Sequence, residues 1–331
     1  MSSKFKFIRF SKSSSGLLLG VVLLWPLESL GEEQAVQQIP QPGLLDNVDA
    51  PRDYLSEKFV GFASYMDRFF GDDRNYQESN KTVVQMDLTR VTGYGGDNQF
   101  ILSARAKLIM PMTERKLNLL VETDPEQNIT GEKSKAQPVI LNKVVAPRSV
   151  ALAARYEKAE AKRWHYSADG GIRFQGLSTK PFARARASLA IPLDKWRLKA
   201  AETIFWFNTT GTGASTQLDV ERLLSEPMLF RASTNGTWLM ESQNSDLRQD
   251  LSFYHTLDER TALLYQVSAI GVSKPQWQVT DYVVSLAYRY RLHREWMFVE
   301  VGPQMHFPKE MNYHFRSSLG IRLEVLFDES R

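Results

Sequence analysis

A histidine close to two serines near the C-terminus is the arrangement in the sequence that comes nearest to catalytic chemistry. His314, Ser317 and Ser318 lie in residues 312–327, where alternating polarity predicts a strand. A lipid-modifying enzyme would need a base and a nucleophile within hydrogen-bond reach. On a regular strand His314 and Ser317 face opposite sides, and His314 and Ser318 are about 13 Å apart. The spacing disfavours a catalytic pair, so a lipid-modifying enzyme is the third hypothesis for this chain.

The other reactive groups predict neither a cofactor site nor a metal site. The chain of 331 residues has 5 histidines and no cysteine, which excludes disulfides and thiolate ligands. His255, His293 and His306 fall near predicted strand ends without the spacing of metal ligands. The glycines of residues 93–96 match a hairpin turn and not a phosphate-binding loop. We therefore expect no catalytic, cofactor-binding or metal-binding residues, and no cofactor.

Charged and apolar residues alternate along most of the chain from Lys81 onward. Hydrophobic residues make up 43% and the mean hydropathy is −0.34, which excludes a bundle of membrane helices. One parity is apolar, and the other carries acidic residues such as Asp169, Asp219 and Glu324 beside many arginines. A packed core does not accept so many charges, whereas the lumen of a membrane barrel does. The residues that we expect to line this lumen are Arg105, Arg155, Arg173, Arg184, Arg186, Arg231, Arg248, Asp250, Asp281, Arg289, Glu300, Arg316 and Arg322.

The predicted fold is all-β: a transmembrane antiparallel barrel of about fourteen strands, with about twelve as the alternative count. The connections alternate between short charged turns and longer loops such as residues 123–147. Both parities of residues 196–208 carry apolar side chains, so the facing of that strand stays open. A closing strand ends on an aromatic residue, and its signal is Gly320, Leu323, Val325 and Phe327. The expected barrel spans residues 81–327, with a tail at 328–331.

The N-terminus has the pattern of a secretory signal peptide. Basic residues between Lys4 and Lys12 precede a short apolar segment at residues 16–27. Small residues at positions 29–31 predict cleavage before Glu32, so the signal would be residues 1–31. A retained anchor helix is the alternative, although the apolar segment is shorter than the about 18 residues that a span needs.

The next segment, residues 32–80, is expected to be a periplasmic lead-in that contains an amphipathic helix at residues 49–71. Apolar residues recur there at steps of three and four, the period of one helix face. This helix could pack against the barrel, plug or gate its periplasmic mouth, or bind a periplasmic partner. The predicted face is Leu55, Phe59, Phe62, Met66 and Phe69.

The run Tyr65-Met-Asp-Arg-Phe-Phe-Gly-Asp-Asp-Arg74, with Asn80 and the first strand after it, resembles a motif of uncharacterised outer-membrane proteins of Gram-negative bacteria. Arg90, Arg105 and residues 108–111 continue the resemblance over about three strands. It implies a signal peptide and a porin-like barrel in the outer membrane. This family has no assigned activity, so the resemblance carries over no functional residues.

These observations favour a passive or gated pore for small polar or anionic solutes. The alternative is a structural or assembly protein with a closed lumen. A net charge of +3 gives no indication of nucleic acid. The expected partners are membrane lipid, lipopolysaccharide and the outer-membrane assembly machinery.

Overall fold

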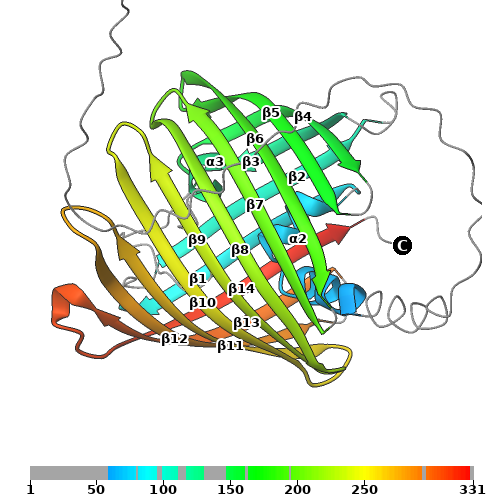
Figure 1. The fold of residues 1–331 in the computed structure, drawn as a ribbon, viewed down its shortest axis with the longest axis vertical. Coiled ribbons are helices and arrows are strands. Elements are labelled where there is room, and N and C mark those ends of the chain that lie inside the picture. The colour runs from blue at the N-terminus through cyan, green and yellow to red at the C-terminus, as the bar shows by residue number, and fades with distance from the viewer. Residues whose placement is uncertain are drawn as a thin grey trace, which may run out of the picture. The chain divides into compact units, whose positions relative to one another are not determined.

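A single closed barrel accounts for nearly all of the structure. The computed structural model describes residues 59–79, 81–94, 99–110, 117–129, 147–160, 163–193, 195–292 and 296–328. Within them, fourteen antiparallel strands pair in sequence order, and β1 closes the barrel against β14 (Figure 1). The strands are β1 (Val83–Gly93), β2 (Gln99–Ile109), β3 (Leu117–Thr123), β4 (Val150–Glu160), β5 (Trp164–Gln175), β6 (Ser178–Leu193), β7 (Trp196–Phe207), β8 (Gly211–Ser225), β9 (Met228–Leu239), β10 (Asn244–Thr256), β11 (Thr261–Val272), β12 (Gln278–Arg291), β13 (Met297–Pro308) and β14 (Arg316–Asp328). The predicted fold class is confirmed, with the larger of the two strand counts.

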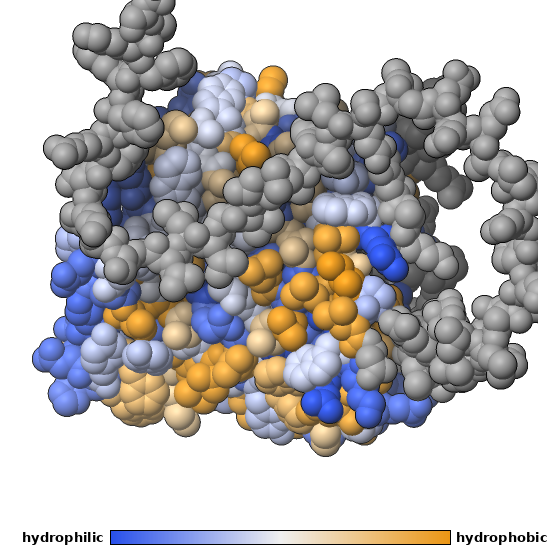
Figure 2. Space-filling model, viewed as in Figure 1, coloured by the Kyte–Doolittle hydropathy of each residue, from blue (hydrophilic) through white to orange (hydrophobic). Residues whose placement is uncertain are grey.

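The alternation of side chains makes the outside of the barrel apolar and the inside polar. On β1, Met86 and Leu88 are exposed on the outer wall. Gln85, which has the opposite parity, is buried inside the barrel. Apolar residues cover much of the outer face in Figure 2. Closure leaves no unpaired strand edge, and an apolar exterior is the surface that lipid requires.

The two ends of the barrel differ. At the terminal end, where β1 begins and β14 ends, β8 and β9 are joined by only Glu226 and Pro227. At the opposite end, residues 124–149 form the connection between β3 and β4, and it contains α3 (Pro125–Ile129). The predicted alternation of short and long connections fits these examples. Several of the predicted connections, including residues 111–114 and 293–295, lie outside the described residues.

Two predicted strand boundaries are wrong. The closing strand begins at Arg316 and not at residue 312, because η2 (Lys309–Met311) is followed by two residues in left-handed backbone conformations. These residues are Asn312 and Tyr313, whose φ angles are 52° and 58°. Asp328, expected in the tail, belongs to β14.

On β7, whose facing the sequence left open, the odd-numbered residues point into the lumen. Phe205 and Phe207 on β7 are buried in the lumen, while Ile204 and Trp206 are exposed outside. Phe207 stacks on Phe182 of β6 with ring centroids 5.3 Å apart. Large aromatic residues therefore fill part of the lumen at this height, which explains why both parities of the strand are apolar.

The segment before β1 lies inside the barrel at its terminal end (Figure 1). Residues 59–69 are helical, a turn follows at residues 70–72, and α2 (Asp73–Glu78) leads toward β1. We call residues 59–79 the plug. Among the described residues, no helix is both long and apolar enough to cross a bilayer. The predicted signal peptide, and the lead-in up to residue 58, lie outside the described residues.

Candidate functional site

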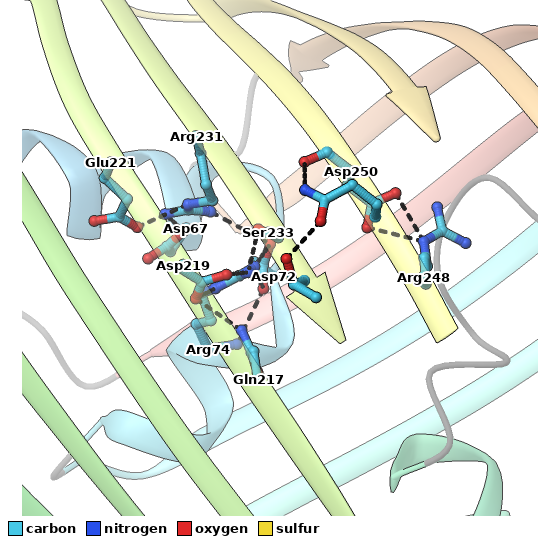
Figure 3. Close-up of polar contacts among 12 residues, drawn as sticks. Asp67, Asp72, Arg74, Gln217, Asp219, Glu221, Arg231, Ser233, Arg248 and Asp250 are labelled. Atoms are coloured by element: carbon cyan, nitrogen blue, oxygen red, sulfur yellow. Dashed lines mark hydrogen bonds and ion pairs between the residues drawn. The ribbon is translucent and has the colours of Figure 1, made fainter. Parts of the chain in front are cut away.

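Arg74 in α2 fixes the plug to the barrel wall. Its Nη2 and Nε donate to the two carboxylate oxygens of Asp219 on β8, at 2.6 and 2.9 Å (Figure 3). Nη2 also donates to Ser233 Oγ on β9, and Nη1 donates to Asp72 at 3.0 Å. A two-pronged guanidinium–carboxylate contact fixes orientation as well as distance. Arg74 therefore couples α2, the preceding turn and two wall strands.

Arg231 on β9 makes a second contact with the plug, this time from the wall. Its Nη2 donates to Asp67 Oδ1 of the helix at 2.6 Å, and its Nε donates to Glu221 Oε1 on β8 at 2.7 Å. Its Nη1 donates to the hydroxyl of Tyr254 on β10. All of these side chains are buried, so each charge depends on its partners for stabilisation.

Apolar contacts hold the other side of the plug. Phe69 meets Phe298 of β13 edge-on with ring centroids 5.5 Å apart, and Phe70 meets Tyr254 of β10 at 5.4 Å. Phe59 lies under the guanidinium of Arg197 on β7. The plug thus contacts the wall from β7 to β13 across this end of the lumen.

Gly71 brings the plug close to the seam between β1 and β14. Its φ is +58°, a conformation that glycine adopts readily. A Cβ at this position would lie 2.3 Å from a carboxylate oxygen of Glu324 on β14. The Gly71 carbonyl accepts from Gln85 Nε2 on β1, and the Phe70 carbonyl accepts from Arg322 on β14. The seam therefore forms part of the seat of the plug.

Burial raises the pKa of Asp67 above its ordinary value, and the neighbouring carboxylate of Asp72 raises this pKa further. The positive charges of Arg231, Lys199 and Arg74 oppose the rise but do not cancel it. With the plug displaced, a solvated Asp67 would return to its ordinary pKa. The seated plug thus binds a proton more readily, so lowering the pH through the raised pKa favours the seated state.

We expect displacement of the plug, and any current that depends on it, to become rarer as the pH is lowered through the raised pKa of Asp67, and Asp67→Asn to weaken this dependence. Single-channel recordings over a pH series measure both effects. An unchanged pH profile in Asp67→Asn would contradict the assignment to this carboxyl.

A ladder of buried ion pairs follows the wall above the plug. Arg155 on β4 donates to both oxygens of Asp169 on β5, at 2.6 and 2.8 Å. Arg184 on β6 donates to Asp169 at 2.8 Å and to Glu122 on β3 at 2.9 Å. These four side chains lie on neighbouring strands and pair along the wall. Much of the lumen charge is therefore neutralised by wall partners.

A second ladder lies beside the seam. Arg289 on β12 donates to Glu324 on β14 at 2.6 Å and to Glu300 on β13 at 3.4 Å. Arg322 on β14 donates to Glu300 at 2.6 Å. Alternating signs on adjacent strands satisfy charges that the lumen buries.

At the opposite end, α3 turns into the mouth of the barrel. Glu126 of α3 pairs with Arg173 on β5 at 2.7 Å and accepts a hydrogen bond from Thr209 beyond β7. Ile129 packs against the buried core cluster, and its carbonyl accepts from Ser215 on β8. Helix α3 thus narrows this mouth.

A chamber of about 610 Å³ lies in the lumen. Its lining includes residues of the plug, such as Arg74, and Ile129 of α3. The described lining contains eight arginines and six aspartates, a formal excess of positive charge. The chamber is large enough for a small polar solute and has charged groups of both signs.

The structure brings seven of the predicted lumen residues to this chamber and places the other six elsewhere. Arg173 contacts α3, Arg231 lies beneath the plug, and Arg289 and Glu300 belong to the ladder at the seam. Asp281 Oδ2 lies 2.9 Å from Nδ1 of His306 and accepts a hydrogen bond from the ring. Arg316 is exposed at the rim, because β14 begins there. The seven at the chamber are Arg105, Arg155, Arg184, Arg186, Arg248, Asp250 and Arg322.

Three other groups of predicted residues have definite positions. Phe59, Met66 and Phe69 of the helix face are buried inside the barrel, Phe62 is half-buried, and Leu55 lies outside the described residues. His314 and Ser317 are exposed at the rim, next to the left-handed turn. The residues of the C-terminal signal that face outward are Leu323, Val325 and Phe327, whereas Gly320 lines the chamber.

The sequence did not identify Arg74 and Asp219 as an anchoring pair. Arg74 precedes the first strand, so the alternation that identified the lumen residues does not apply to it. Asp219 was expected on the polar face, but its partner is 145 residues away in sequence. A charged turn directly before a barrel strand was the only local signal.

No family model matches the chain, and no curated protein sequence matches it. Among solved structures, it is similar to a bacterial polysaccharide outer membrane secretin, with a TM-score of 0.48, 11% identity, and 75% of this chain and 98% of that chain covered. It is also similar to OprB of Pseudomonas putida, with a TM-score of 0.47, 10% identity, and 78% and 97% of the chains covered. The outer membrane channel DcaP of Acinetobacter baumannii gives a TM-score of 0.44, 9% identity, and 75% and 96% coverage. At these identities and TM-scores, we base the functional proposal on the geometry of this chain.

Proposed function

We propose that this protein is an outer-membrane channel for small polar solutes, with a preference for anions, and that the plug gates it. The observation that supports this proposal most directly is the charge-lined chamber, which the plug covers at the terminal end. Barrels of eight strands are filled by side chains, and barrels of 16 to 18 strands leave a water channel. A barrel of fourteen strands has room for both a plug and a narrow pathway.

A closed scaffold is the second candidate. The two ladders of wall ion pairs, together with the Arg74 and Arg231 contacts, support it because they resemble a lumen that is sealed by pairing. In this case the protein would act through partners in the envelope rather than by conduction.

The deciding experiment is conductance of the full-length protein, refolded and reconstituted in planar bilayers. The channel proposal expects discrete current steps and a larger permeability for small anions than for cations. Insertion is checked independently by the mobility shift of the folded barrel in unheated gels. A barrel that inserts and stays silent, both as wild type and after loosening of the plug, would favour the scaffold.

Arg186→Glu is expected to shift the reversal potential in a salt gradient toward cation selectivity. Arg186 on β6 lines the chamber and donates to Thr203 on β7 at 3.1 Å, outside the two ladders. Its charge therefore lies where a solute passes, and reversing it changes the local potential. Arg184 is less suited to this test because it is buried between Asp169 and Glu122.

The matched control is Arg260→Glu, in the exposed turn between β10 and β11. This control changes the net charge by the same amount away from the chamber. Equal shifts of the reversal potential in both variants would contradict a selectivity role for the lumen.

A further inference from the structure

The outer wall carries a polar patch at mid-height on β7 to β10, strands that lie side by side in Figure 1. Glu202 on β7 shares the outward parity of Ile204 and Trp206, which are exposed. Thr216 on β8 is its register partner, and the threonine hydroxyl donates to a Glu202 carboxylate oxygen at 2.5 Å. A carboxylate thus faces outward in the middle of a strand.

The patch continues on the next two strands. Thr234 on β9 pairs in register with Gln249 on β10, and its hydroxyl donates to the Gln249 Oε1 atom. We call Glu202, Thr216, Thr234 and Gln249 the outer polar patch. The Glu202 carboxylate lies at the β7 side of the patch, and the Gln249 carboxamide lies at its β10 side.

Small residues form part of the border of this patch, beside the larger exposed side chains of Ile204, Leu218 and Leu247. Glu202 pairs in register with Ala187 on β6, and Thr216 pairs with Gly236 on β9. Ala214 and Ala232 lie two positions along the strands from Thr216 and Thr234, on the same outer face. Small side chains allow another wall to approach closely, as they do between membrane helices.

The other side of the barrel has a different surface. On β11 and β12, the outward residues at mid-strand are apolar, as in Val267 and Val284, which are partners in register. Polar side chains that face lipid are costly, and one hydroxyl satisfies only part of a carboxylate. The patch is therefore poorly suited to acyl chains.

We infer that the outer polar patch is the contact surface for a second copy of this chain. A two-fold axis parallel to the barrel axis, passing between β8 and β9, would set β7 of each copy against β10 of the other. The Glu202 carboxylate would then face the Gln249 carboxamide, which has a second N–H group besides the one that donates to the Asp250 carbonyl. Such a self-complementary surface is what an isologous dimer requires.

This inference rests on the proposed placement of the barrel in a membrane, but it does not depend on conduction. A silent barrel can dimerise and a conducting barrel can be monomeric, so the two proposals fail separately. The chain has no cysteine, so single introduced cysteines report proximity without background.

The test is oxidative crosslinking of the full-length protein in lipid vesicles. Ala214→Cys and Ala232→Cys keep the four polar side chains of the patch, and Val284→Cys on the far wall is the matched control. We expect a disulfide-linked dimer from at least one of the first two variants, persisting as the lipid-to-protein ratio is raised, and monomer from Val284→Cys.

A second measurement is the dimer dissociation constant in mild detergent by analytical ultracentrifugation. Glu202→Leu is expected to raise it by about tenfold or more, because the leucine removes the acceptor for the partner. Monomers throughout, equal crosslinking from Val284→Cys, or tighter association of Glu202→Leu would overturn the inference.

Discussion

If the barrel conducts as proposed, replacing Arg74 by alanine is expected to raise its open probability by at least about a hundredfold. Breaking a buried ion pair by removing one partner costs about 3–5 kcal/mol, and each 1.4 kcal/mol is a factor of ten in a population. Arg74 holds the plug to Asp219 and Ser233, so this cost falls on the seated state. Current recordings of the full-length variant in planar bilayers measure the change.

Arg260→Ala is the matched control, because it removes an arginine from an exposed turn far from the plug in sequence. Asp219→Asn weakens the same contact from the wall side and should increase openings as well. The double variant is expected to add less than the sum of the single effects, since both substitutions act on one interaction. An Arg74→Ala channel that opens no more often than Arg260→Ala would show that this contact does not hold the gate.

Asp169→Ala is expected to lower the free energy of unfolding by about 3–5 kcal/mol. Asp169 lies between Arg155 and Arg184, and its removal leaves two buried guanidiniums with one acidic partner fewer each. Urea unfolding of the refolded barrel in detergent micelles, followed by tryptophan fluorescence, measures the loss.

Glu259→Ala is the comparison, because Glu259 lies exposed in the turn after β10 and should change stability by less than about 0.5 kcal/mol. Asp169→Asn keeps the shape but only one of the two acceptor oxygens, and we expect it to fall between these variants. A midpoint for Asp169→Ala equal to that of Glu259→Ala would mean that the ladder contributes nothing to stability.

Alternation was sufficient to predict the barrel and the inward face of most strands. The period of two is a property of the extended backbone, so Gln85, Arg155 and Arg289 could be assigned to the lumen without knowledge of any contact. The same rule could not assign β7, because Phe205 and Phe207 are apolar residues that face inward against other lumen side chains. Which residues of β7 point inward depends on the side chains that fill the lumen beside them, and these come from other parts of the chain.

Charge pairing could not be predicted from the same pattern. Parity places Arg184 in the lumen, but only the register of neighbouring strands and the reach of the side chain bring it to Asp169 and Glu122. The arginines of the polar face therefore divide into those that stabilise the wall, such as Arg184, and those beside the chamber outside the ladders, such as Arg186. The start of β14 was also missed, since Asn312 and Tyr313 sit in an alternating sequence but adopt left-handed conformations.

The position of Gly71 at the seam has a consequence for how the protein is assembled. The plug precedes β1 directly, and its contacts extend to β8 and β9 and to the last two strands, β13 and β14, which are made at the end of synthesis. Once β1 has joined β14, a folded helix with these buried aromatic residues has no side entrance. The plug can therefore reach its seat only before the barrel closes or through the terminal end, so the pairing of β1 with β14 and the seating of the plug are coupled steps of assembly.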